Sequence, residues 1–61
     1  MTADQFACVL SYPQATVLRD ESGAVWVKRG TLHWQRPGSL GDYGPEAIVW
    51  PVEVLWRPPI T

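Results

Sequence analysis

The sequence predicts an all-β fold, a small antiparallel meander of about five short strands that forms a partly closed barrel or a curled sheet. Prolines at positions 13, 37, 45, 51, 58 and 59 interrupt the chain, and proline disrupts helix interiors. Only residues 14–36 offer a long window without proline, and Ser22-Gly23 and Gly30 break that window with residues typical of turns. Seven Val, two Ile and four Thr supply the β-branched side chains that favour strands.

The first apolar segment spans residues 5–10. Hydrophobic periodicity does not distinguish a strand from a helix in so short a run. We expect a strand there, with a short helix as the alternative.

The centre of the chain predicts three consecutive strands at residues 15–19, 24–28 and 31–36. The first reversal, Asp20-Glu-Ser-Gly23, begins with Asp and ends with Gly, which is typical of a type I turn followed by a residue in the left-handed region. The second reversal is expected at Arg29-Gly30, as a two-residue loop in which Gly adopts a positive φ. Residues 31–36 then alternate as the third strand.

These two turns fix the register and therefore the face on which each side chain lies. Leu18, Trp26 and His33 are expected in one row across the three strands. The opposite face is expected to form the core, and it carries Ala15, Val17, Val25, Val27, Leu32 and Trp34.

The C-terminal third predicts a loop followed by short extended runs. Residues 37–45 have proline at both ends and Gly at 38, 41 and 44, which is typical of a loop. Residues 47–50 and 52–57 are expected to be strands bent at Pro51, because proline cannot donate a hydrogen bond to a sheet.

Length and composition restrict the classes of function. With 61 residues, the chain is expected to form a single domain over residues 1–61. Its net charge of −1 disfavours binding to nucleic acid or to an anionic membrane through a general electrostatic field. One Cys and one His allow neither an internal disulfide nor an ordinary zinc site, so we expect no metal and no cofactor. The unpaired Cys and the absence of a signal peptide predict a cytoplasmic protein.

Few residues have the chemistry that catalysis requires. Cys8 and His33 are the only possible nucleophile and base pair. Their distance in the sequence and the lack of a third group favour a packed thiol and a solvated histidine instead. Asp20 and Glu21 lie in a predicted turn, where Asp bonds to its own backbone. The sequence therefore predicts a protein that is not an enzyme.

Four tryptophans provide the best candidates for a binding surface, because Trp is enriched at interface hot spots. Trp26 is expected on the polar face beside Leu18 and His33, and Tyr43 in the glycine-rich loop is a further candidate. The alternative is that the C-terminal arm covers Trp26. The expected partner is another protein or a second copy of the chain, as in a homodimer, and the alternative function is stacking of single-stranded nucleic-acid bases on exposed Trp.

A recurring pattern covers residues 17–45 and consists of Asp20-Glu-Ser-Gly-Ala-Val-Trp26, a second tryptophan at Trp34, and Tyr43-Gly-Pro45. In this pattern the chain resembles a group of small uncharacterised β proteins encoded by phages of actinobacteria. It implies an accessory protein without enzymatic activity, located in the host cell, that acts on a host or phage component. It implies no particular binding residues.

Overall fold

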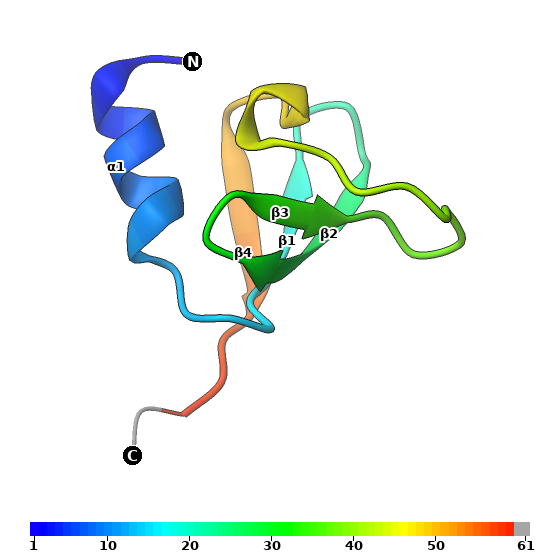
Figure 1. Ribbon diagram of the computed structural model, residues 1–61. Coiled ribbons are helices and arrows are strands. Elements are labelled where there is room, and N and C mark those ends of the chain that lie inside the picture. Colours follow the sequence, from blue (N-terminus) through cyan, green and yellow to red (C-terminus); the bar gives the residue numbers. More distant parts are fainter. Residues whose placement is uncertain (60–61) are drawn as a thin grey trace.

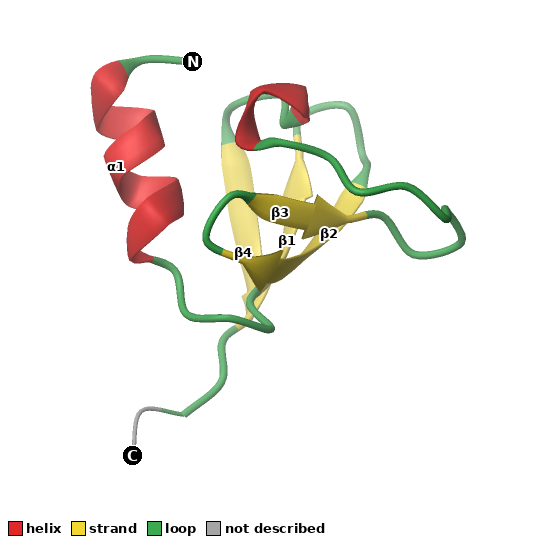
Figure 2. Ribbon diagram, viewed as in Figure 1, coloured by secondary structure: helices red, strands yellow, loops and turns green. Residues whose placement is uncertain are grey.

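The computed structural model describes residues 1–59, which form one short helix, a four-stranded sheet and a single 3₁₀ turn (Figures 1 and 2). The elements in chain order are α1 (Ala3–Ser11), β1 (Val17–Asp20), β2 (Val25–Gly30), β3 (His33–Gln35), η1 (Pro45–Ala47) and β4 (Val52–Trp56).

The sheet is antiparallel, with the strand order β3-β2-β1-β4. The last strand returns to pair with the first, so β3 and β4 are the two edges, and the sheet is not closed. The prediction of a small, mostly β protein is confirmed. The prediction of a purely β protein with about five strands and a partly closed barrel is wrong, because residues 1–59 form four strands in an open sheet and begin with a helix.

The N-terminal segment is helical rather than extended. Thr2 accepts a hydrogen bond from the backbone N–H of Gln5 at 3.1 Å, and the Gln5 side chain accepts one from the Thr2 backbone N–H at 2.9 Å. This reciprocal capping box satisfies two of the N–H groups that a helix start leaves free. Val9 lies on the buried side of α1, and Tyr12, just after the helix, is also buried.

The first hairpin follows the predicted register. Leu18 pairs with Trp26 and Val17 pairs with Val27. The Asp20 backbone N–H bonds to the Ala24 carbonyl at 2.9 Å, and Gly23 has a φ of 89°. Glycine is favoured at this position because a positive φ brings no Cβ penalty.

The second hairpin does not follow the predicted register. β2 continues through Gly30, which pairs with His33, so the chain reverses at residues 31–32 instead of at Arg29-Gly30. Lys28 pairs with Trp34 and not with Thr31, and an irregularity at Arg29 adds one residue to β2. This shift brings Trp34 to the same face as Lys28.

The predicted faces of the sheet are therefore wrong. Leu18, Trp26 and Trp34 are all buried on one face, together with Val9, Tyr12 and Ile48. Figure 1 shows α1 and the 37–47 segment on this side of the sheet. Of the predicted core residues only Trp34 is buried, whereas Ala15 and Leu32 are exposed and the three valines Val17, Val25 and Val27 are half-buried.

The C-terminal third agrees with the prediction in part. The expected strand at 52–57 is β4, which spans Val52–Trp56. The expected strand at 47–50 is absent among the described residues, and the chain instead makes the 3₁₀ turn η1 with the buried Pro45 at its start. Ile48, just after this turn, reaches the core.

Candidate functional site

A buried carboxylate binds the turn of the first hairpin to the buried face of the sheet. Asp20 is 5% exposed, and its Oδ1 accepts hydrogen bonds from the Ser22 hydroxyl and from the backbone N–H groups of Ser22 and Ala24. Its Oδ2 accepts from the Trp26 indole at 2.8 Å and from the Val49 backbone N–H at 3.2 Å. Burial alone would raise the pKa of Asp20, but these hydrogen bonds outweigh it and lower the pKa to about 2.

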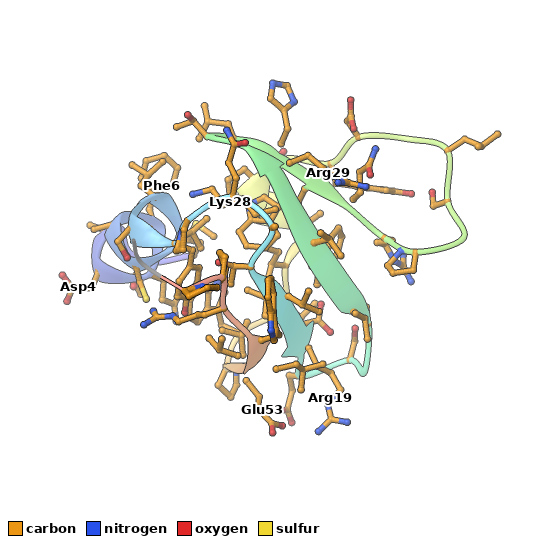
Figure 3. All side chains as sticks on the ribbon, turned by 90° about the horizontal axis from the view of Figure 1, so that it is seen from below. Asp4, Phe6, Arg19, Lys28, Arg29 and Glu53 are labelled. Atoms are coloured by element: carbon orange, nitrogen blue, oxygen red, sulfur yellow. The ribbon has the colours of Figure 1, made fainter. Side chains whose placement is uncertain are left out.

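A buried lysine holds α1 against the same face. Lys28 is 3% exposed, and its Nζ donates to the carbonyl oxygens of Val9, Leu10 and Tyr12 at 2.9, 3.3 and 2.7 Å. These are carbonyls at the C-terminal end of the helix, where cations are favoured. Burial lowers the pKa of Lys28. Figure 3 shows Lys28 directed toward α1 and Arg29 on the other side of the strand.

Two of the four predicted contact residues belong to the core. Leu18 is 0% exposed and Trp26 is 2% exposed, so neither presents a surface to a partner. Trp26 is covered by the Tyr43 ring, whose centroid is 5.3 Å away, and by the Arg36 guanidinium at 5.5 Å. The 37–44 loop therefore covers Trp26, in place of the C-terminal arm that the sequence analysis considered.

The other two predicted contact residues lie at separate places. His33 is exposed at the start of β3, where it pairs with Gly30. Tyr43 is half-buried and bridges to Trp34 through two backbone hydrogen bonds of 2.8 Å, so its main contacts are within the fold. The structure does not bring the four predicted residues together as one exposed site.

Three half-buried valines lie on the other side of the sheet. Val17, Val25 and Val27 alternate with the buried residues of β1 and β2, so they point away from the core. Directly opposite residues of an antiparallel pair share a face, and Val17 is opposite Trp56. We call this surface the open face and define it by Val17, Val25, Val27 and Trp56.

A β-bulge places Trp56 on the open face. Between the pairs Leu18–Val54 and Val17–Trp56, β4 contains one extra residue, Leu55. Trp56 is 51% exposed and Leu55 is 45% exposed. Trp56, Val17, Val27 and Gln35 consequently form a row that crosses all four strands.

Polar side chains border this row on both sides. On one side, Arg19 Nη2 and Glu53 Oε2 form an ion pair of 2.7 Å. On the other side, Arg29 donates from Nε to the Gln35 side chain at 2.8 Å. Figure 3 shows Arg19 and Glu53 together at the opposite end of the sheet from Arg29. An apolar centre with a polar rim is the usual anatomy of a protein interface.

Only part of this surface could be predicted from the sequence. Alternation correctly placed Val17, Val25 and Val27 on one face, but both faces of the meander carry large apolar residues, and the register of the second hairpin decided which one was covered. Nothing in the sequence pattern predicted the bulge at Leu55 that turns Trp56 to the valine side.

An open cleft of about 480 Å³ lies beside the first turn and is lined in part by Arg19, Glu21, Pro51 and Glu53. Neither Cys8 nor His33 lines it. Cys8 is on α1, where its thiol bonds to the Tyr12 hydroxyl at 3.3 Å. Burial, followed in size by this hydrogen bond, raises the pKa of Tyr12 to about 12.

Among residues 1–59, no three His, Cys, Asp or Glu side chains gather in a way that could hold a metal ion. Over the same part of the chain, no helix has the length and apolar character needed to cross a membrane. No protein-family model matches the chain, and no curated protein or solved structure is significantly similar to it.

Proposed function

We propose that this chain is a non-enzymatic protein–protein interaction module that binds its partner through the open face. The observation that carries the proposal is the row Trp56, Val17 and Val27, in which a half-exposed tryptophan continues a stripe of valines across the sheet. Tryptophan is among the residues most enriched at interface hot spots.

The valines of the open face contribute little to the core. The half-buried hydrophobic residues that pack against the core are Ala24, Tyr43, Trp50 and Val52. Within residues 1–59, Val17, Val25 and Val27 are not in that group, so their partial burial comes from neighbours on their own face. In a chain this small, a sheet face left without a covering layer is apolar surface that a partner can bury.

The sequence suggested Trp26 as the contact residue, whereas this proposal assigns that role to Trp56. Both are tryptophans in the sheet, but Trp26 is 2% exposed and Trp56 is 51% exposed. The resemblance of residues 17–45 to small phage proteins supports an accessory role, in which the partner is a host or phage protein or another copy of the chain.

Base stacking has less support, because every basic side chain is already engaged. Arg19 is paired with Glu53, and Arg29 is bonded to Gln35. The remaining basic residues are the buried Lys28, Arg36 over the Trp26 ring and Arg57 over the Tyr12 ring. A single-strand binding groove requires free cations beside its aromatic residues.

Affinity capture with three matched proteins tests the proposal. Tagged wild type, Val27→Lys and Leu40→Lys would be incubated with lysate of the organism that encodes the chain, and retained proteins would be identified by mass spectrometry. Leu40 is fully exposed in the 37–44 loop and serves as the control. We expect wild type and Leu40→Lys to retain the same proteins and Val27→Lys to lose them. Equal retention by all three would refute a binding role for the open face.

A further inference from the structure

We propose that the free edge of β4 binds an extended segment of another protein, which adds to the sheet as a further strand. This inference concerns a different surface from the open face, so it goes beyond the proposed function. The observation that carries it is that the outward backbone groups of Val52 and Val54 have no hydrogen-bond partner within residues 1–59.

The two edges of the sheet differ in how they are covered. At the β3 edge, Trp34 and Tyr43 exchange two backbone hydrogen bonds of 2.8 Å, so the 37–44 loop occupies the place of a further strand. At the β4 edge, among the described residues, no backbone hydrogen bond outside the sheet involves Val52–Trp56. Figure 1 shows β4 as the outer strand on its side of the sheet, with α1 on the core face. The β4 edge is therefore the one that an added strand can reach.

Hydrogen bonds along β1 show which backbone groups of β4 point outward. In an antiparallel sheet, successive residues direct their N–H and C=O groups to opposite sides of the strand. The Asp20 N–H bonds to the Ala24 carbonyl at 2.9 Å, so Asp20 faces β2. The N–H of the next residue, Glu21, bonds to the Val49 carbonyl at 3.0 Å and so faces the β4 side. By the same alternation, the backbone of Arg19 faces β4.

The alternation continues in β4. Arg19 pairs with Glu53, so the backbone of Glu53 faces β1. The backbones of Val52 and Val54 consequently face away from the sheet, and each of these valines offers one N–H donor and one C=O acceptor. Groups at this spacing are matched by the backbone of another extended chain, a mode of recognition known as strand addition. The occupant that these groups select is polypeptide in an extended conformation.

The side chains of β4 indicate which segment fits. Val54 lies opposite Leu18 on the core face and is 38% exposed. A residue beside Val54 on the added strand would cover the rest of this side chain, which favours Val, Ile or another apolar residue. Glu53 lies on the other face, in its exposed ion pair with Arg19, so its neighbour on the added strand is expected to be polar. We therefore expect a segment in which apolar and polar residues alternate.

Two features keep the pairing short. Pro51 precedes β4 and cannot donate a hydrogen bond to a neighbouring strand, and the bulge at Leu55 interrupts the regular spacing. The outward groups of Val52 and Val54 lie between these two features. Bulges and prolines at an edge also oppose pairing with long strands of unrelated chains. We therefore expect weak, reversible binding of a short segment.

A displayed library of linear peptides, each about 10 residues long and so able to form one strand, tests the inference. The library would be selected on wild type, and an enriched peptide would be synthesised and titrated against wild type, Val54→Pro and Val54→Ala. Val54→Pro removes the outward N–H without removing a bond to β1, and edge strands tolerate proline. Val54→Ala is the matched control, because it shortens the same side chain and keeps the N–H. We expect Val54→Pro to weaken binding about tenfold, as the loss of a hydrogen bond at the centre of the pairing would cause, and Val54→Ala to weaken it clearly less.

Amide hydrogen exchange followed by NMR provides a readout that does not depend on a variant. In the free protein the Glu53 amide, which faces β1, should exchange slowly, and the Val54 amide should exchange rapidly. The peptide should slow exchange at Val54 and leave Glu53 slow. Circular dichroism shows whether Val54→Pro is folded, and if it is not, the exchange measurement decides alone.

Four results would overturn the inference. They are a slow Val54 amide in the free protein, a library that yields no binding peptide, a peptide that leaves the Val54 amide unprotected, and equal affinity of the peptide for wild type and a folded Val54→Pro.

This test and the lysate capture fail separately, because the capture depends on the Val27 side chain and the titration depends on the Val54 backbone. If the peptide leaves Val54 unprotected while the capture depends on Val27, the proposed function stands and strand addition is refuted. If the peptide protects Val54 while the capture does not depend on Val27, the edge site stands and the role of the open face is refuted.

Discussion

The Trp26 indole donates a hydrogen bond of 2.8 Å to Oδ2 of Asp20, six residues earlier in the first hairpin. Both side chains are buried, at 2% and 5% exposure. This bond joins the turn to the core, because the other oxygen of the same carboxylate accepts the turn N–H groups of Ser22 and Ala24. It also holds Trp26 on the buried face of the sheet, which leaves Val25 and Val27 on the open face.

Asp20→Asn should destabilise the protein by about 2 kcal/mol. Every group that faces the carboxylate is a donor, so either orientation of the new amide places its NH₂ against donors such as Trp26 Nε1 or the Ser22 N–H. Urea unfolding followed by circular dichroism measures the change. Glu21→Gln is the control, since Glu21 is exposed in the same turn, and it should shift the free energy of unfolding by less than about 0.5 kcal/mol. Equal effects of the two substitutions would contradict the role assigned to Asp20.

The stability of the protein should fall in acid because of the same carboxyl group. The pKa of Asp20 is lowered from 3.8 to about 2 in the folded protein, so the folded state binds the proton less readily than the unfolded state. The stabilising contribution is therefore complete above about pH 5 and is lost as the pH falls toward 2, and it amounts to about 2 kcal/mol. Urea unfolding at a series of pH values should show this loss in wild type and a smaller one in Asp20→Asn. Parallel pH profiles for the two proteins would argue against it.

Lys28→Met should loosen α1 without dissolving the sheet. The substitution keeps most of the apolar stem but removes the Nζ donor from the carbonyls of Val9 and Tyr12. We expect faster hydrogen exchange at the amides of α1 and a loss of about 1–3 kcal/mol in the free energy of unfolding. Arg29→Met, at the neighbouring exposed position, is the matched control and should leave α1 protected. If α1 exchanges equally slowly in both variants, Lys28 does not anchor the helix.

Leu18→Ala should cost about 2–5 kcal/mol of unfolding free energy, because Leu18 is 0% exposed at the centre of the core. Leu40→Ala, at a fully exposed leucine, should change it by less than about 0.5 kcal/mol. Thermal unfolding by calorimetry compares the two. A small effect at Leu18 would indicate that this residue lies on the surface, on the polar face to which the sequence analysis assigned it.

Much of the sheet could be predicted from the sequence, because local chemistry decides it. The turn from Asp20 to Gly23 fixes the first hairpin, and the proline residues at 51 and 58 limit the last strand. The helix α1 also has a local indicator, since the spacing of Thr2 and Gln5 is that of a capping box. Its apolar run is too short for hydrophobic periodicity to distinguish a helix from a strand.

The second hairpin could not be predicted locally, because tertiary burial overrides turn preference there. A reversal at Arg29-Gly30 suits glycine, a preference of about 1 kcal/mol. The observed register instead brings Trp34 to the face of Trp26, where it is 0% exposed. Burying a tryptophan removes about 200 Å² from water, which is about 5 kcal/mol at 25 cal/mol/Å². The predicted register would place Trp26 and Trp34 on opposite faces, whereas the observed register buries both on one face. Burying the two tryptophans together therefore outweighs the turn preference, and it decides both the register and which face of the sheet stays open.

Hydroxyl-radical labelling of the protein alone and together with the proteins that it retains from the lysate, with oxidation quantified at each tryptophan by mass spectrometry, tests most directly whether the open face is the binding surface. In the protein alone Trp56, which is 51% exposed, should be oxidised much faster than Trp26 and Trp34, which are 2% and 0% exposed. With the retained proteins present the rate at Trp56 should fall, while the rates at Trp26 and Trp34 stay low. Oxidation of Trp26 as fast as that of Trp56, or a rate at Trp56 that the retained proteins leave unchanged, would show that the open face is not the binding surface.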